Sequence, residues 1–142
     1  MKTNDLNKHL TADALAGYCM ESTLWKILFQ MADFMLESQP MAINPDDILI
    51  ERDRFVIKDN ALPASEPDAV WKLAASICYI SSGHIVFGQN GKEYQKSHPN
   101  VKLPVLQKEH SALTPLIHKC LDADETKRIS LQQLSQLAKT GL

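Results

Sequence analysis

The stretch that most constrains the fold is residues 67–82, which is apolar around much of a helical circumference. Its apolar side chains are Val70, Trp71, Leu73, Ala74, Ala75, Ile77, Cys78 and Ile80. A helix that is apolar on most sides is usually buried at the centre of a domain. Gly83 follows this stretch, and glycine commonly ends a helix. We therefore expect the other elements to pack around this one central helix.

Other segments show the apolar spacing of three and four residues that marks one face of a helix. The longest runs over about residues 22–37, with Leu24, Ile27, Leu28, Met31, Phe34 and Met35 in that spacing. A shorter segment begins at Ser111, and a last one begins behind Ser130, whose hydroxyl suits a helix cap. A short helix is also expected before Gly17, and another over about residues 92–96. These segments predict a mainly α fold.

Two short apolar runs between the first long helix and the central helix have a different character. Residues 48–50 and 55–57 are rich in β-branched side chains, and the polar residues 51–53 between them suit a turn. This arrangement is typical of a small β-hairpin. Residues 60–67 hold two prolines and several small residues, which indicate a loop. The predicted architecture is a helical bundle around a buried central helix, with one small hairpin.

Length, charge and hydropathy exclude several classes of protein. The chain has 142 residues, which suits a single domain over residues 10–142 behind a polar, flexible segment 1–9. Its 15 basic and 17 acidic residues leave a formal net charge of −2, whereas nucleic-acid binders usually carry a basic excess. The longest nearly apolar run, residues 69–80, is too short to span a bilayer. We therefore expect no nucleic-acid partner and no membrane association.

The cysteines and the start of the chain bear on the compartment. Three widely spaced cysteines make no disulfide framework, because their number is odd and their spacing is long. The first residues are polar and contain no apolar core of a secretory signal. A cytoplasmic location is therefore expected.

Motifs that carry common chemistries are missing. The five glycines fit neither G-x-G-x-x-G nor the P-loop pattern, and no C-x-x-C or H-E-x-x-H offers a zinc ligand set. His118 and Cys120 are two residues apart, which points them to different faces of a helix. The remaining loop histidines, His84, His98 and His110, are expected to be solvated. No cofactor is predicted.

Several segments, in this order, resemble the C-terminal lobe of protein kinases: Ile43–Ile50, Phe55–Ala61, Ala69–Ala74, Gly83–Pro104 and Leu116–Ser130. The first resembles the catalytic loop with the strand after it, and the second resembles the strand that enters the D-F-G position. The third resembles the central helix of that lobe, and the last its closing helix pair. The resemblance covers roughly residues 22–139 and implies a protein kinase-like C-lobe fold.

The departures from the kinase pattern concern the catalytic groups. No N-lobe, glycine-rich loop or phosphate-holding strand lysine has a counterpart in the sequence. If Pro45 is set on the catalytic-loop proline, Ala42 occupies the position of the catalytic aspartate, and a methyl group cannot orient a hydroxyl. Asp47 then replaces the metal-binding asparagine and Asp59 keeps the D-F-G aspartate, so this pair is the candidate metal site. The resemblance therefore implies a lobe without kinase activity.

The resemblance also assigns structural roles. Only about ten residues separate Asp59 from the central helix, which is too short for an activation segment. Glu66 stands at the A-P-E glutamate, and we expect it to form a buried ion pair with Arg128. Trp71 is expected in the core, because its neighbours on the helix are apolar.

The functional expectation follows from the retained core and the missing catalytic groups. The chain is similar to kinase non-catalytic C-lobe (KIND) modules, which bind other proteins and are not enzymes. We expect a protein partner on the face that an N-lobe would cover, built from the hairpin (residues 46–58) and the first long helix. An open apolar face also favours association of two copies, so a homodimer is a further expectation.

Two alternatives stay open. In the first, the chain is half of a split kinase or nucleotide-dependent enzyme that a partner chain completes, with Asp47 and Asp59 on the metal. In the second, the chain shares only a helical architecture with kinases and has an unrelated function, because a fold does not determine a function.

Overall fold

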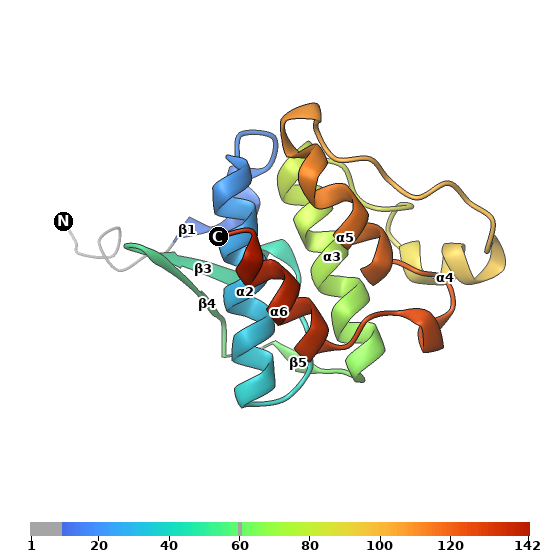
Figure 1. Ribbon diagram of the computed structural model, residues 1–142, viewed down its shortest axis with the longest axis horizontal. Coiled ribbons are helices and arrows are strands. Elements are labelled where there is room, and N and C mark those ends of the chain that lie inside the picture. The colour runs from blue at the N-terminus through green and yellow to red at the C-terminus, as the bar shows by residue number, and fades with distance from the viewer. Residues whose placement is uncertain (1–9, 60) are drawn as a thin grey trace.

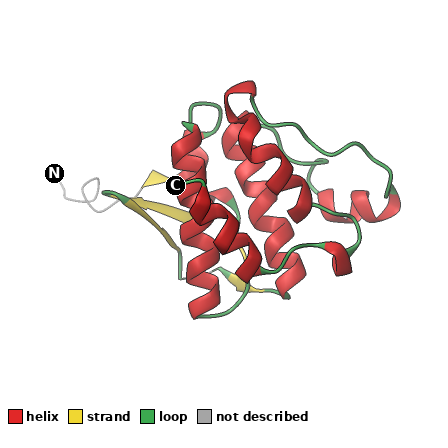
Figure 2. Cartoon of the chain, viewed as in Figure 1, coloured by secondary structure: helices red, strands yellow, loops and turns green. Residues whose placement is uncertain are grey.

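The structure is a computed structural model that describes residues 10–59 and 61–142 (Figure 1). The segment 1–9, expected to be flexible, lies outside the described residues. Helices dominate the described chain and the strands are short (Figure 2). The mainly helical fold class predicted from the sequence is therefore confirmed.

The central helix is α3, Glu66–Ser82, and it contacts α2, α5 and strand β2. Ser65 caps its first turn by accepting a hydrogen bond from the backbone N–H of Asp68. Gly83 ends the helix with a φ of +82°, a left-handed conformation that glycine adopts without a Cβ clash. Its buried residues are Ala69, Val70, Trp71, Leu73, Ala74, Ser76, Ile77, Cys78, Ile80 and Ser81. The expectation of a buried central helix is confirmed.

Two further helices pack against one another beside α3, α2 (Glu21–Glu37) and α6 (Leu131–Thr140) (Figure 1). The predicted apolar face of α2 is buried through Leu24, Ile27, Leu28, Met31, Ala32 and Met35. As predicted, Ser130 caps α6, and its hydroxyl oxygen accepts from the N–H of Gln133 at 3.1 Å. The free energy that holds this pair together comes chiefly from the apolar area removed from water.

The predicted hairpin is present as β3 (Ile48–Glu51) and β4 (Arg54–Ile57), with Ile50 opposite Phe55. A third strand, β1 (Leu10–Thr11), pairs antiparallel with β3 and was not predicted. Two residues are too few to show an alternating pattern, so only the pairing itself reveals them.

A second small sheet joins β2 (Met41–Ala42) to β5 (Leu62–Pro63). The second of these strands lies within the segment predicted to be loop. Its pairing holds the residues before α3 against the residues that follow α2.

The remaining helices are short. They are the 3₁₀-helices η1 (Ala12–Leu15), η2 (Pro45–Asp47), η3 (Lys108–Leu113) and η4 (Glu125–Lys127), and the α-helices α4 (Gly91–Ser97) and α5 (Thr114–Cys120). The predicted short helices near residues 12–16 and 92–96 correspond to η1 and α4. Among the helices of the described residues, none combines the length and the apolar content that a membrane crossing requires.

The expectation that His110 is solvated is wrong. Only 2% of its surface is exposed, and its Nδ1 lies 2.7 Å from the hydroxyl oxygen of Ser81. Its Nε2 donates to the carbonyl oxygen of Cys19, also at 2.7 Å. The segment that carries His110 is irregular in sequence, but it folds over the end of α3 and so buries the ring. His84 and His98 are exposed, as predicted.

Candidate functional site

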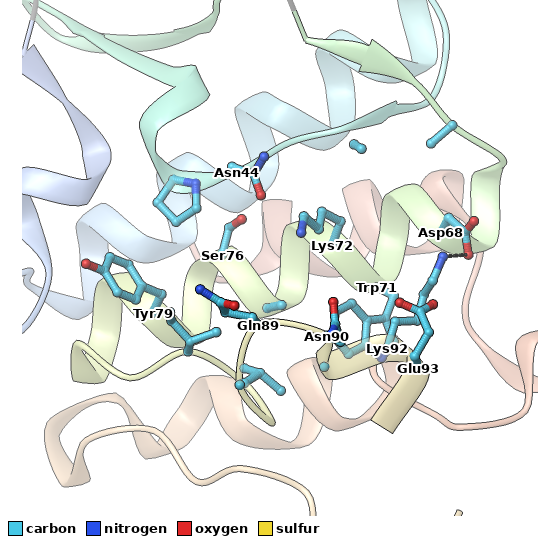
Figure 3. Close-up of a pocket in the computed structure, with 18 of the residues that line it drawn as sticks. Asn44, Asp68, Trp71, Lys72, Ser76, Tyr79, Gln89, Asn90, Lys92 and Glu93 are labelled. Carbon is cyan, nitrogen blue, oxygen red and sulfur yellow. Dashed lines mark ion pairs between the residues drawn. The ribbon is translucent and has the colours of Figure 1, made fainter. Parts of the chain in front are cut away.

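A hollow of about 720 Å³ runs along one face of α3 (Figure 3). Its floor is formed by helix positions that recur every three or four residues: Asp68, Trp71, Lys72, Ala75, Ser76 and Tyr79. Residues at this spacing share one side of a helix. From the first to the last of them α3 rises by about 16 Å, at 1.5 Å per residue. We call this hollow, with the floor and the two walls described below, the α3 groove.

One wall of the α3 groove is the segment that links α2 to the hairpin. It contributes Ala42, Asn44, Pro45 and Asp46. A buried contact attaches this wall to the floor, because the Ser76 hydroxyl donates to the carbonyl oxygen of Ile43 at 2.7 Å. The backbone of the wall is therefore held at a set distance from α3.

The opposite wall is the segment 85–93, which leads into α4. Gly91 allows this wall to lie close to α3. A Cβ at that position would lie 2.2 Å from the carbonyl oxygen of Val86 and 3.2 Å from the ring of Trp71. Only a residue without a side chain fits there, so Gly91 shapes the groove.

A strained turn lies in the same wall. Phe87 has a φ of +57°, and Gly88 follows with +84°. Non-glycine residues seldom adopt the left-handed region, and Phe87 holds it while packing against the core and lying 6.0 Å, between ring centres, from Tyr94. This packing offsets the backbone cost and sets the direction in which the wall enters α4.

An ion pair occupies one end of the groove. Lys92 Nζ lies 2.8 Å from Oδ1 of Asp68, and Nη1 of Arg128 lies 4.0 Å from the same oxygen. The hydrogen bond from Lys92 holds the pKa of the Asp68 carboxyl below its ordinary value. Burial lowers the pKa of the Arg128 guanidinium. Lys92 and Asp68 are therefore already paired with one another within the protein.

Lys72 lies near the middle of the floor and is half-buried. Its amine points into the groove toward Asn44 (Figure 3). Among residues 10–59 and 61–142, the amine of Lys72 has no ion-pair partner and no hydrogen-bond partner. The α3 groove thus contains one paired lysine at its end and one lysine available to a ligand at its centre.

Of the residues singled out in the sequence, Ala42 lies in the wall of the groove. The position that the kinase resemblance assigns to a catalytic carboxylate therefore presents a methyl group there. Trp71 is 4% exposed, so its expected core position is confirmed, and it also lines the groove.

The metal pair of Asp47 and Asp59 stays a prediction, and the backbone N–H of Lys58 donates to the carbonyl oxygen of Asp47 at 2.8 Å, so the two segments are neighbours. Asp47 is half-buried, and its Oδ2 accepts from the backbone N–H of Asn44 at 2.9 Å, which closes η2. Asp59 is exposed. Within the described part of the chain, no group of three histidine, cysteine, aspartate or glutamate side chains is placed to hold a metal ion.

The predicted buried ion pair between Glu66 and Arg128 is wrong. Arg128 donates to the carbonyl oxygens of Asp122 at 2.8 Å and Pro67 at 3.2 Å, and its charge faces Asp68. Glu66 is exposed, and its carboxylate accepts from the N–H of Leu131 at 3.0 Å, at the start of α6. Glu66 and Asp68 are two positions apart on α3, so their side chains point about 200° apart around the helix axis. The helix therefore directs Asp68, and not Glu66, toward Arg128.

The face expected to bind a partner is partly covered. Strand β1 pairs with the β3 edge of the hairpin, and α6 and β4 pack on α2. The outward side of the hairpin carries Leu49 and Val56, which lie opposite one another and are half-buried. The groove lies elsewhere, along α3.

The sequence did not predict that four residues line one site: Asn44, Lys72, Gln89 and Asn90. They come from three segments that no local pattern relates. The residue in the sequence that comes nearest to indicating the groove is Gly91. The reason why glycine is needed there, the close approach of Val86 and Trp71, is visible only in the structure.

Comparison of the sequence with protein-family models gives no match, and comparison with curated proteins gives none.

Proposed function

We propose that this chain is a non-catalytic, protein kinase-like C-lobe that binds a protein partner in the cytoplasm. The observation that carries the proposal is Ala42 in the wall of the groove. Phosphoryl transfer needs a carboxylate to orient the hydroxyl, a phosphate cradle and a lysine that holds the phosphates. The loss of each such electrostatic group costs a factor of about a hundred or more in rate. We therefore expect no phosphoryl transfer by a chain without all three groups, and binding is the function that we propose for it.

Two further observations support the proposal. A hairpin follows Pro45 and a buried helix follows the hairpin, in the order that the kinase resemblance implies. Cys19, Cys78 and Cys120 are free thiols, which suits a reducing compartment. The absent Glu66–Arg128 pair counts against the resemblance at one point, but Arg128 still anchors the start of α3 through Pro67.

Calorimetric titration of the purified chain with Mg-ATP tests the non-catalytic part. We expect no binding heat, and saturable micromolar binding would overturn it. Phosphotransfer is then assayed with candidate partner chains added. Activity that Asp59→Ala abolishes would favour the split-kinase alternative.

The binding part is tested by isolating a partner and reconstituting the pair from purified proteins. Light scattering after size exclusion distinguishes a heteromeric complex from a homodimer, which is the other assembly we expect of an exposed face. A chain that stays monomeric and binds no purified protein would refute the proposal.

A further inference from the structure

We infer that the α3 groove binds an extended peptide segment of the partner, and that Lys72 pairs with one acidic side chain of that segment. This inference rests on the proposed function, because it names the site and the chemistry by which the binding module recognises its partner. Four features of the groove support this inference: its length, the groups on its walls, the charge at its centre and the charges at its rim.

The length of the groove fits a short extended segment. A floor of about 16 Å matches about five residues of extended chain, which advances about 3.3 Å per residue. An extended chain of this length places its alternate side chains toward the floor and away from it.

The walls carry groups that match a peptide backbone. Asn44 stands on one wall, and Gln89 and Asn90 stand on the other, with α3 between them (Figure 3). A carboxamide donates and accepts hydrogen bonds, as a peptide group does. The side chains of Gln89 and Asn90 are exposed and make no hydrogen bond to any residue that the structure describes. They are available to the main chain of a ligand, whatever its sequence.

Lys72 supplies the specificity. Its amine is half-buried at the centre of the floor, whereas the other groove lysine, Lys92, already lies 2.8 Å from Asp68. An amine that has lost part of its water gains from a carboxylate that replaces those lost contacts. A segment with an aspartate or glutamate over Lys72 is therefore preferred.

The rim limits how acidic the segment is. Asp13, Asp46 and Glu93 also line the groove. A uniformly acidic peptide meets these three carboxylates and is repelled, because like charges brought together cost free energy. The preferred ligand has one acidic residue at the centre and neutral or basic residues on both sides.

The test is a binding selection with octapeptides that are acetylated and amidated at their ends and varied at every position. We expect the wild-type chain to select peptides with aspartate or glutamate at one position and no acidic residue near the ends. Lys72→Glu should reverse that preference to lysine or arginine. Lys72→Ala should weaken the binding of the best acidic peptide by up to about fivefold in fluorescence anisotropy, the loss of one modest ion pair. Lys96→Glu, at an exposed lysine of α4 outside the groove, should leave the selection unchanged.

Thermal unfolding of each variant shows whether it is folded. If Lys72→Glu does not fold, Gln89→Glu places the same charge on an exposed wall position and should also disfavour the acidic peptides. The inference is overturned if no octapeptide is selected, or if the selected peptides bind Lys72→Glu or its substitute as well as they bind the wild type. A purified partner that binds wild type and Lys72→Glu equally well would refute the groove as the site while leaving the proposed function intact.

Discussion

Gln95 Oε1 accepts a hydrogen bond from the indole N–H of Trp71 at 2.7 Å, and the two side chains are 2% and 4% exposed. The amide nitrogen of Gln95 donates to the carbonyl oxygen of Leu121 at 2.6 Å. This buried side chain therefore links α4 to the floor of the α3 groove and to the end of α5. The position of the groove wall formed by residues 85–93 therefore depends on Gln95.

Replacing Gln95 with leucine should lower the free energy of unfolding by about 2–4 kcal/mol, because it leaves the buried indole N–H of Trp71 and the buried carbonyl of Leu121 without hydrogen-bond partners. Urea denaturation measures the change. The matched control is Lys96→Leu at the next, exposed position of α4, which should change stability by less than about 0.5 kcal/mol. A loss below that value for Gln95→Leu would show that the link carries no stability.

His110 and His84 form a matched pair, since both were expected to be solvated and only His84 is exposed. His110→Ala removes hydrogen bonds to Ser81 and Cys19 and leaves a cavity, so it should cost about 2–4 kcal/mol of unfolding free energy. His84→Ala should be nearly neutral. Equal effects of the two substitutions, measured by urea denaturation, would contradict the buried position of His110.

The Asp68 carboxyl makes stability depend on pH. The hydrogen bond from Lys92 lowers its pKa in the folded chain below the ordinary value of 3.8. A group whose folded pKa is depressed stabilises the fold above its unfolded pKa and loses that contribution as the pH falls through the folded pKa.

Asp68→Asn should therefore be less stable than the wild type at neutral pH, by less than about 1 kcal/mol because solvent screens the partly exposed pair. The difference should shrink below about pH 4. Urea denaturation of both proteins across this pH range measures it. A difference that stays constant with pH would assign the effect to packing and not to charge.

The three cysteines should be unreactive in the folded chain. Burial raises the pKa of the Cys78 thiol to about 12 and that of Cys19 to about 11, and it raises the pKa of Cys120 as well. Because the thiolate is the reactive form, Ellman's reagent should label none of them at mildly alkaline pH until the protein is denatured. Ser97→Cys, at an exposed position, provides the rapidly labelled control. A native cysteine that reacts as fast as this control would contradict the burial.

The long helices and the hairpin were predictable because their signals are local. Apolar spacing placed one helix over residues 22–37, and the structure has Glu21–Glu37. The central helix was expected over residues 67–82 and extends from Glu66 to Ser82. Ser130 and Gly83 mark helix ends through hydrogen bonds and backbone geometry that involve only their neighbours.

The predictions that proved wrong concern contacts between residues that are distant in the sequence. Arg128 faces Asp68 and not Glu66, because the choice depends on how α3 is rotated about its axis when it packs. His110 is buried because its segment folds over Ser81, 29 residues earlier in the chain. No local sequence pattern predicts either of these two contacts.

The sequence by itself determined the mainly helical class, the buried central helix, the hairpin and the alanine at position 42. Periodicity, capping and residue identity depend only on neighbours along the chain, so they can be read without a structure. Tertiary packing alone decided that Asn44, Lys72 and Asn90 line one groove, and that β1 and β5 find their partner strands. These features arise when distant segments bury apolar area against one another. The free energy of that burial depends on both segments, so it cannot be predicted from either segment alone.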